Sequence, residues 1–138
     1  MLAATIRRVG LQDDEFEAYC GLRIMLWPMP EEDNRREASQ LLVESRKWAV
    51  FLATGEHGMP LGFAEVRLRE YAEGASSSPV GFLEGWYVVP EARKQSVGRR
   101  LVERAESWAR SMGCTENGVE HRNRKKRQHR SPQTSRIR

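Results

Sequence analysis

The spacing of apolar residues predicts two helices in the first third of the chain. A short strand around Ile6 leads into residues 12–26, where acidic residues at the start favour a helix and apolar residues recur on one face. The prolines of residues 27–30 end this helix, since proline lacks an N–H donor and biases the preceding residue away from helical angles. A second helix with one buried stripe is expected from Glu31 to about Arg46.

Apolar and polar residues then alternate in two segments separated by a turn. Residues 48–54 and 61–71 show this alternation, which is typical of strands with one buried face. The glycine-containing residues 55–58 between them have the composition of a turn. Together these segments predict a β-hairpin.

One further strand and one further helix complete the pattern. Residues 80–90 are the most strand-like segment of the chain and end at a proline. Residues 96–112 place Val97 and Leu101 at helical spacing, and Gly113 follows as a C-terminal cap. The order of elements indicates an α+β fold in a single domain.

Charge divides the chain into two unequal parts. Residues 117–138 contain eight Lys or Arg and one acidic residue, Glu120, so this segment carries a net charge of +7. The whole chain carries +4, which leaves −3 for residues 1–116. The excess of basic residues therefore belongs to a C-terminal segment with few apolar residues, which we predict to be a disordered tail.

The sequence shows no pattern typical of export, membrane insertion or metal binding. No segment has the roughly 20 apolar residues that a membrane span needs, and the N-terminus lacks the pattern of a secretory signal. We therefore expect a cytoplasmic protein without a membrane partner. Cys20 and Cys114 have neither CxxC spacing nor His partners, so we expect two reduced, partly buried thiols and no metal.

The segment between the last predicted strand and the last predicted helix carries the clearest chemistry. A helix N-terminus presents unpaired N–H groups and the positive end of a dipole, which suits a pyrophosphate. Arg93, Lys94, Arg99 and Arg100 surround it with positive charge. From these residues alone a solvated turn is the alternative, because basic residues are common near helix starts and the segment has one glycine, Gly98.

Several motifs occur in a family-specific order and spacing. They are GLRIMLWP at residues 21–28, REYAEG at 69–74, SSPVGFLEG at 77–85, VVP at 88–90 and RKQSVG at 93–98. Their combination resembles the aminoglycoside 6'-N-acetyltransferases of the GNAT superfamily over about residues 5–116. The resemblance implies a GNAT-like mixed sheet flanked by helices. It also implies transfer of an acetyl group from acetyl-CoA to the 6'-amino group of aminoglycoside antibiotics, which confers resistance.

The resemblance also implies roles for individual residues. Trp27 corresponds to the aromatic wall of the drug site, Tyr71 to a second aromatic contact, and Glu84 to a carboxylate that faces the acceptor amine and helps to remove its proton. Without the resemblance, Trp27 would be interpreted as a core aromatic and Glu84 as an exposed strand carboxylate. The implied acetyl-CoA-binding residues are Trp86, Tyr87, Val88, Arg93, Lys94, Gln95, Ser96, Val97, Gly98 and Arg99.

The implied cofactor site has two parts, a strand for the pantetheine arm and a loop for the pyrophosphate. The strand backbone at Trp86–Val88 is implied to pair with the pantetheine arm and to polarise the thioester carbonyl. The loop from Arg93 to Gly98 resembles the Arg/Gln-x-x-Gly-x-Gly/Ala loop that cradles the pyrophosphate in this family. Ser96 replaces the first glycine of that loop, and its side chain is expected to weaken phosphate binding.

The resemblance stops after Glu116. Back-translation of residues 117–138, read one nucleotide later, permits family-like segments, so we predict that a frameshift produced the tail. GNAT enzymes bind the pantetheine arm where the fourth and fifth strands splay apart, and loss of the fifth strand would remove one wall of this cleft. We therefore expect residues 1–116 to be the N-terminal part of a GNAT domain that lacks the normal C-terminal strands. Such a chain is expected to be poorly folded or inactive.

Three alternatives remain at this point. The chain could be a GNAT enzyme for another amine, such as a polyamine or a protein terminus. The basic tail could bind nucleic acid through phosphate contacts, although it lacks aromatic residues for base stacking. The chain could also be an inactive relative that only dimerises, because the related full-length enzymes are commonly homodimers.

Overall fold

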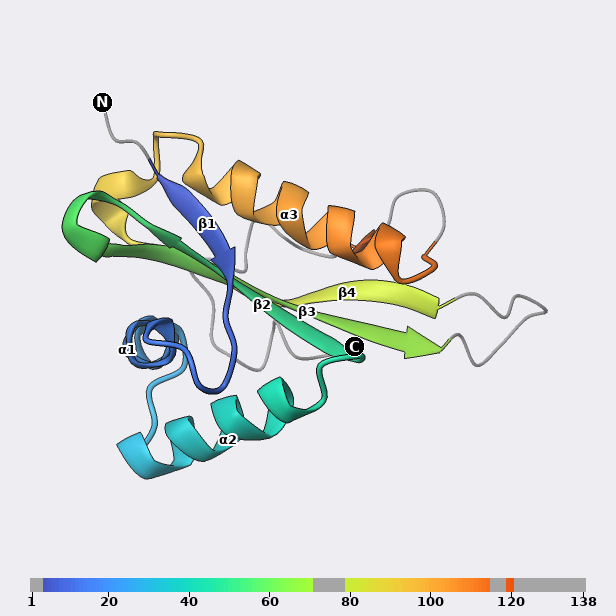
Figure 1. The fold of residues 1–138 in the computed structure, drawn as a ribbon. Helices are drawn as coiled ribbons and strands as arrows, with labels where there is room; N and C mark the ends of the chain where they lie inside the picture. Colours follow the sequence, from blue (N-terminus) through green and yellow to red (C-terminus); the bar gives the residue numbers. More distant parts are fainter. Residues whose placement is uncertain (1–3, 71–78, 115–118, 121–138) are drawn as a thin grey trace.

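The computed structural model describes residues 4–70, 79–114 and 119–120 and has the predicted mixed sheet flanked by helices (Figure 1). The helices are α1 (Glu15–Leu26), α2 (Glu31–Val43) and α3 (Val97–Ser111), with short 3-10 turns at Glu56–Gly58 and Pro90–Ala92. The strands are β1 (Thr5–Arg8), β2 (Trp48–Thr54), β3 (Pro60–Glu70), β4 (Pro79–Val88) and β5 (Val119–Glu120).

The sheet has the strand order β1-β2-β3-β4-β5. The first four strands are antiparallel to their neighbours, and β5 is parallel to β4. The predicted hairpin is confirmed as β2 and β3, in which Phe51 pairs with Ala64 and Leu52 with Phe63. β4 pairs with β3 along its whole length, so the most strand-like segment of the sequence lies next to the hairpin.

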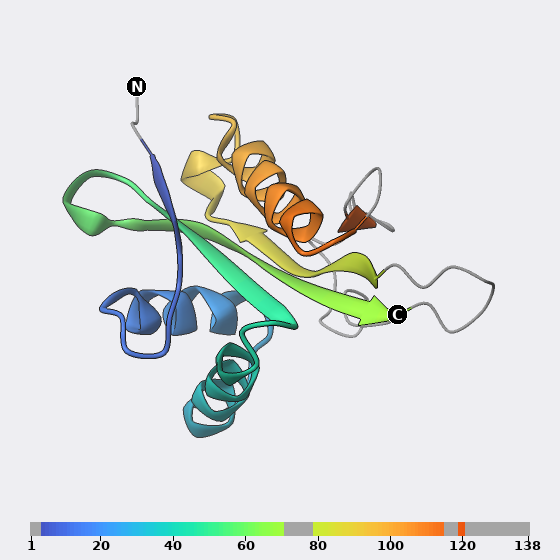
Figure 2. The ribbon, with the colours of Figure 1, turned by 45° about the vertical axis from the view of Figure 1, so that its right-hand side comes forward.

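Alternation along the strands divides the apolar side chains between two cores, one on each face of the sheet. Phe51 and Ala64 face α3, whereas Leu52 and Phe63 face α1 and α2. Figures 1 and 2 show α3 on one face of the sheet and the other two helices on the opposite face. The predicted amphipathic character of α3 is confirmed, because its buried residues are Val97, Leu101, Val102, Ala105 and Ala109.

Both N-terminal helices are shorter than predicted. α1 begins later than residue 12 because Asp13 belongs to a preceding turn, in which its carboxylate accepts a hydrogen bond of 2.7 Å from the Gly10 N–H. α2 ends before Arg46, and the Glu44 N–H donates to the Leu41 carbonyl in a closing turn. The proline segment separates the two helices as predicted. Among the described helices, none is long and apolar enough to cross a membrane.

β5 was not predicted from the sequence. Val119 pairs with Gly81 and Glu120 with Phe82, so the chain contains the start of a fifth strand beside β4. An open strand edge presents unpaired N–H and C=O groups, which a nearby segment can satisfy by pairing. The structure thus adds two residues of a fifth strand to the predicted fold. The rest of the predicted tail, residues 117–118 and 121–138, lies outside the described residues, as does Tyr71.

Candidate active site

A loop joins β4 to α3 and presents backbone N–H groups at the start of the helix. The Arg100 N–H donates to the Ser96 carbonyl over 3.0 Å, which is the first hydrogen bond of the helix. The N–H groups of Val97, Gly98 and Arg99 precede it and have no carbonyl partner within the helix. Together with the helix dipole they form a site suited to an anionic phosphate.

Gly98 allows this helix start to approach β4 closely. A methyl group on Gly98 would lie 3.2 Å from Cζ2 of Trp86 and 3.4 Å from Cγ2 of Val88. The indole of Trp86 packs against the α3 core, whereas Tyr87 points to the opposite face and joins the α1/α2 core. The predicted pyrophosphate loop and the predicted pantetheine strand are thus adjacent.

The side chains of the loop have different roles. Arg93 does not extend into solvent: its Nε donates to the Val88 carbonyl over 2.7 Å, and its guanidinium lies 5.6 Å from the Tyr87 ring centroid. Arg93 therefore ties the loop to the end of β4. Lys94 is exposed and can contact a phosphate, while Gln95 donates to a backbone carbonyl of the preceding turn.

Ser96 adopts the left-handed conformation that a glycine would favour. Its φ is 67° and its ψ is 9°, and its hydroxyl accepts a hydrogen bond of 3.0 Å from Nη2 of Arg99. A left-handed residue with a Cβ costs about 1 kcal/mol relative to glycine. Ser96 thus holds a left-handed backbone although it carries a Cβ.

Replacing Ser96 with glycine is expected to tighten acetyl-CoA binding about three- to tenfold, because it removes the side chain next to the phosphate site. Isothermal titration with CoA measures this change. His57, with a φ of 58°, provides the matched control in the β2–β3 turn. His57→Gly relieves the same kind of strain but should leave CoA affinity unchanged, and equal affinities for all three proteins would contradict the prediction.

Trp27 lies against β4. It follows the last residue of α1, and its side chain is 1% exposed. A methyl group on Gly85 would overlap Cη2 of the Trp27 ring, so this glycine creates the space that the indole occupies. The ring also lies 6.3 Å from Phe63, between centroids. Trp27 is therefore buried like a core aromatic residue. It also lies next to Gly85, the neighbour of the predicted site residue Glu84.

Glu84 occupies a β-bulge next to Gly85. In the register of β3 and β4, Glu65 pairs with Gly85 and Val66 with Leu83, which leaves Glu84 as the additional residue. The side chain is 3% exposed, and its Oε2 accepts a hydrogen bond of 3.1 Å from Nη2 of Arg69. Glu84 is thus a buried, ion-paired carboxylate and not an exposed one, and the bulge fixes its direction.

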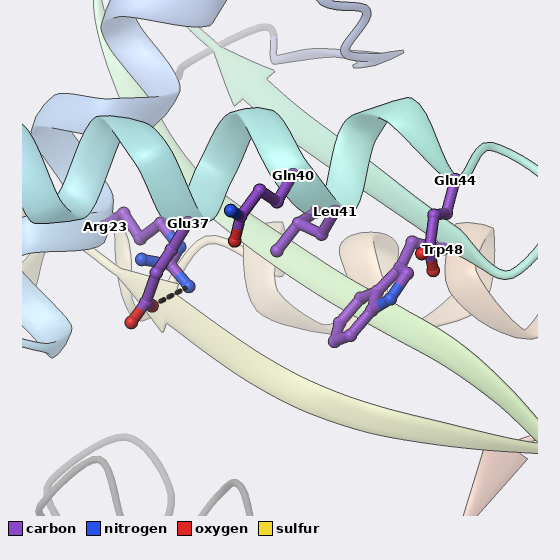
Figure 3. A pocket seen from close by; sticks show the side chains of 6 residues that line it. All are labelled: Arg23, Glu37, Gln40, Leu41, Glu44 and Trp48. Atoms are coloured by element: carbon purple, nitrogen blue, oxygen red, sulfur yellow. Dashed lines mark hydrogen bonds and ion pairs between the residues drawn. The ribbon is translucent and has the colours of Figure 1, made fainter.

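A pocket of about 330 Å³ lies beneath α2 on the α1/α2 face of the sheet (Figure 3). Glu37 extends from α2 toward the guanidinium of Arg23, and Trp48 forms the other end of the pocket. Carboxylates and an aromatic ring suit a polar, cationic ligand. The lining residues are Arg23, Glu37, Gln40, Leu41, Glu44 and Trp48.

No sequence pattern assigned a role to three charged residues that lie near Trp27 and Glu84 in the structure, namely Arg23, Glu65 and Arg69. Arg69 belongs to a recognised motif, but its ion pair with Glu84 depends on the strand register. Arg23 and Glu65 are both completely buried and form an ion pair of 2.7 Å. The available signal was the carboxylate of Glu65 between the apolar residues Ala64 and Val66, since a charge is rarely buried without a partner.

The cysteines provide no reactive group in the structure. Both are buried, and burial raises the pKa of the Cys20 thiol to about 11. Burial also raises the pKa of Cys114. Both thiols are therefore protonated near neutral pH and unsuited to nucleophilic attack. Within the described ranges, no three His, Cys, Asp or Glu side chains are grouped as metal ligands.

Comparison with known sequences identifies relatives of one kind. The chain is 46% identical over 115 residues to an aminoglycoside N(6')-acetyltransferase type 1 of Stenotrophomonas maltophilia, which covers 83% of this chain and 72% of the relative. It is also 46% identical over 102 residues to the enzyme of the same name from Klebsiella aerogenes, covering 72% of this chain and 67% of that enzyme.

The fold is also similar to solved structures of aminoglycoside N-acetyltransferases. The aminoglycoside N-acetyltransferase AAC(6')-Iy in complex with CoA superimposes with a TM-score of 0.75 at 30% identity, over 90% of this chain and 80% of that one. AAC(6')-Iy bound to a bisubstrate analogue, CoA-S-monomethyl-acetylneamine, gives a TM-score of 0.72 at 32% identity, over 86% of this chain and 79% of that one.

The family profile described as acetyltransferase (GNAT) family matches residues 11–128. This match extends past Glu116, where the motif resemblance stops, and includes β5. The profile covers most of the chain, and relatives at up to 46% identity carry the name of one enzyme. The chain therefore belongs to the GNAT family of acetyltransferases.

Proposed function

We propose that this protein transfers the acetyl group of acetyl-CoA to the 6'-amino group of an aminoglycoside, as the names of its relatives describe for them. The observation that carries the proposal is the arrangement along β4. Glu84 lies at the bulge beside Trp27, and the phosphate-binding start of α3 lies beyond the end of the same strand. β4 thus carries the carboxylate proposed to contact the amine, and the loop that follows β4 carries the N–H groups proposed to bind the pyrophosphate.

The proposed reaction begins with an aminoglycoside ammonium group near Glu84. The ammonium must lose a proton before its nitrogen can attack the thioester carbon, and a nearby carboxylate can accept that proton directly or through water. Backbone N–H groups at Trp86–Val88 would stabilise the negative charge that develops on the carbonyl oxygen. The C–S bond then breaks, and CoA leaves as a thiolate that takes up a proton.

The loop before α3 supports this reaction through cofactor binding. Its free N–H groups, with Lys94 and Arg99, would hold the pyrophosphate of acetyl-CoA. Arg93 keeps the loop against β4 through the Val88 carbonyl. By the resemblance, Tyr71 would add an aromatic contact to the acceptor. No metal is needed for any of these steps.

Incubation of the purified chain with acetyl-CoA and an acceptor tests the proposal. We expect acetylation of kanamycin, with the new amide at the 6' position, as identified by mass spectrometry and NMR. Spermine and a protein N-terminal peptide serve as the competing acceptors. Preferential acetylation of either would support a GNAT enzyme for another amine instead. Salt-sensitive DNA binding that depends on residues 117–138, without acetylation, would favour the nucleic-acid alternative.

The short β5 leads to a prediction about rate. Within the part of the chain that the structure describes, β5 pairs with Gly81 and Phe82, near the end of β4 that lies away from the predicted pantetheine strand. We expect a strand this short to leave the thioester poorly enclosed. A poorly enclosed thioester is not held in a fixed orientation toward the attacking amine, so we expect slow turnover. A hybrid that joins residues 1–116 to the C-terminal part of the S. maltophilia relative should acetylate kanamycin about 100-fold faster. Equal rates for the two chains would show that the native segment is sufficient.

Two finer properties are proposed as well, a homodimer from the resemblance and a cytoplasmic location from the sequence pattern of the N-terminus. We expect a homodimer, which light scattering of the purified chain measures directly. We also expect a cytoplasmic location, which fractionation of an expressing bacterium with a periplasmic marker enzyme would test. A monomer at micromolar concentration, or recovery with the periplasmic marker, would contradict the respective expectation.

A further inference from the structure

A cluster of buried polar residues lies beneath Trp27. Arg23 and Glu65 are both 0% exposed, and Nε of Arg23 donates to Oε2 of Glu65 over 2.7 Å. The Tyr19 hydroxyl donates to the same oxygen over 2.6 Å. Burial raises the pKa of Tyr19 well above its usual value, so the hydroxyl keeps its proton and remains a donor.

The other nitrogens of Arg23 bind α2. Nη1 donates to Oδ1 of Asn34 over 3.0 Å, and Nη2 donates to Oε1 of Glu37 over 3.1 Å. Asn34 is itself held, because its amide donates to the Cys20 carbonyl over 2.9 Å. Figure 3 shows the Arg23–Glu37 contact at one end of the pocket beneath α2. The guanidinium therefore connects α1, α2 and β3 in one fixed orientation.

This fixed guanidinium lies directly against Trp27. Cζ of Arg23 is 4.8 Å from the centroid of the Trp27 ring. The backbone N–H of Trp27 donates to the backbone carbonyl of Arg23 over 2.9 Å at the end of α1. The carboxylate partner of Arg23 belongs to Glu65, which pairs with Gly85 where the register shifts at Glu84. The cluster thus touches both parts of the proposed acceptor wall, the aromatic ring and the bulge.

Stability alone does not explain a buried ion pair. The cost of removing two charges from water offsets much of their attraction, and apolar residues of similar volume often stabilise a core equally well. A planar arginine with three fixed donors does, however, define the position of an aromatic ring on which it stacks. The arrangement is therefore better suited to orientation than to stability.

We propose that Arg23, oriented by Glu65, is a positioning residue that holds Trp27 against the bulge and thereby sets the affinity for the acceptor. The affinity part rests on the proposed function, since it supposes an aminoglycoside next to Trp27. The structural part, that Arg23 determines the position of the Trp27 ring, does not depend on any activity.

The test uses the double variant Arg23→Met/Glu65→Gln. It removes both charges together, and the new amide oxygen can still accept from Tyr19, so no buried charge is left unpaired. The chain is labelled with 5-fluorotryptophan, and the Trp27 fluorine resonance is assigned with Trp27→Phe. In the double variant we expect this resonance to shift or broaden, kanamycin to bind about tenfold more weakly, and CoA to bind as in the wild type.

Arg8→Met is the matched control. Arg8 stacks on another tryptophan, with Cζ 5.3 Å from the Trp108 ring centroid. This variant should change the Trp108 resonance and leave both the Trp27 resonance and kanamycin affinity unchanged. It shows what loss of an arginine–indole stack does away from the acceptor wall.

Three results would overturn the proposal. An unchanged Trp27 resonance in a folded double variant would show that Arg23 does not position the ring, whether or not kanamycin binds. A changed resonance with unchanged kanamycin affinity would show that the position of the Trp27 ring does not set the affinity for the acceptor. A double variant that does not fold would assign the pair to stability. If wild-type protein fails to bind kanamycin, the proposed function fails, and the fluorine spectra still decide the structural part.

Discussion

Replacing Glu84 with glutamine is expected to lower kcat/KM for kanamycin about 100-fold or more. Glutamine has nearly the same shape, and its amide oxygen can still accept the hydrogen bond from Arg69, which is 3.1 Å from the carboxylate in the structure. The negative charge that attracts the ammonium group and the base that accepts its proton are both lost. General-base catalysis by a positioned side chain contributes about 100- to 10,000-fold to a rate.

The measurement is made in the hybrid chain with the C-terminal part of the S. maltophilia relative, where we expect the highest turnover. Glu56→Gln is the matched control, because this exposed carboxylate lies in the turn between β2 and β3. It should leave kcat/KM unchanged. If Glu84→Gln acetylates kanamycin as fast as the Glu56→Gln control, Glu84 is a structural partner of Arg69 and has no role in proton transfer.

Replacing Gly85 with alanine is expected to destabilise the fold by about 2 kcal/mol, a typical cost of excess volume in a packed core. The added methyl group would overlap Cη2 of Trp27 and lie 3.1 Å from Cζ3. Trp27 is 1% exposed and cannot move outward without opening the α1/α2 core. We therefore also expect weaker kanamycin binding, because the ring and the bulge can no longer keep their relative position.

Thermal and urea unfolding measure the stability change. Gly21→Ala serves as the control, since nothing lies within 4 Å of a methyl group at Gly21 and alanine favours the helix by up to about 1 kcal/mol. Combining Gly85→Ala with Trp27→Phe removes the part of the ring that overlaps. The double variant should lose less stability than the two single changes added together. Simple additivity would mean that the two residues do not compete for the same space.

Much of the fold follows from local pattern. Alternation in residues 48–54 predicts β2, and the apolar spacing from Val97 to Ala109 predicts α3, because one buried face leaves a period of two in a strand and 3.6 in a helix. The prolines at 28 and 30 predict the break between α1 and α2 for reasons of backbone geometry. β5 could not be predicted, since two residues carry no period and their pairing depends on the open edge of β4.

The candidate site was predictable only in part. The motif resemblance named the loop from Arg93 to Gly98 and pointed to Trp27 and Glu84. It did not show that Ser96 keeps a left-handed backbone, nor that Arg93 binds a carbonyl of β4. Hydrogen bonds between residues distant in sequence depend on the register of strands and the packing of helices.

The sequence by itself determined the family and the order of helices and strands from β1 to α3, and it named the candidate site residues, because these follow from motifs and from local periodicity. The tertiary structure decided how the charges are used. Glu65 and Arg23 lie 42 positions apart, and only the packing of α1 on β3 makes them an ion pair. Likewise, the bulge at Glu84 exists because Glu65 pairs with Gly85 and Val66 with Leu83, and no local pattern in β4 specifies that register.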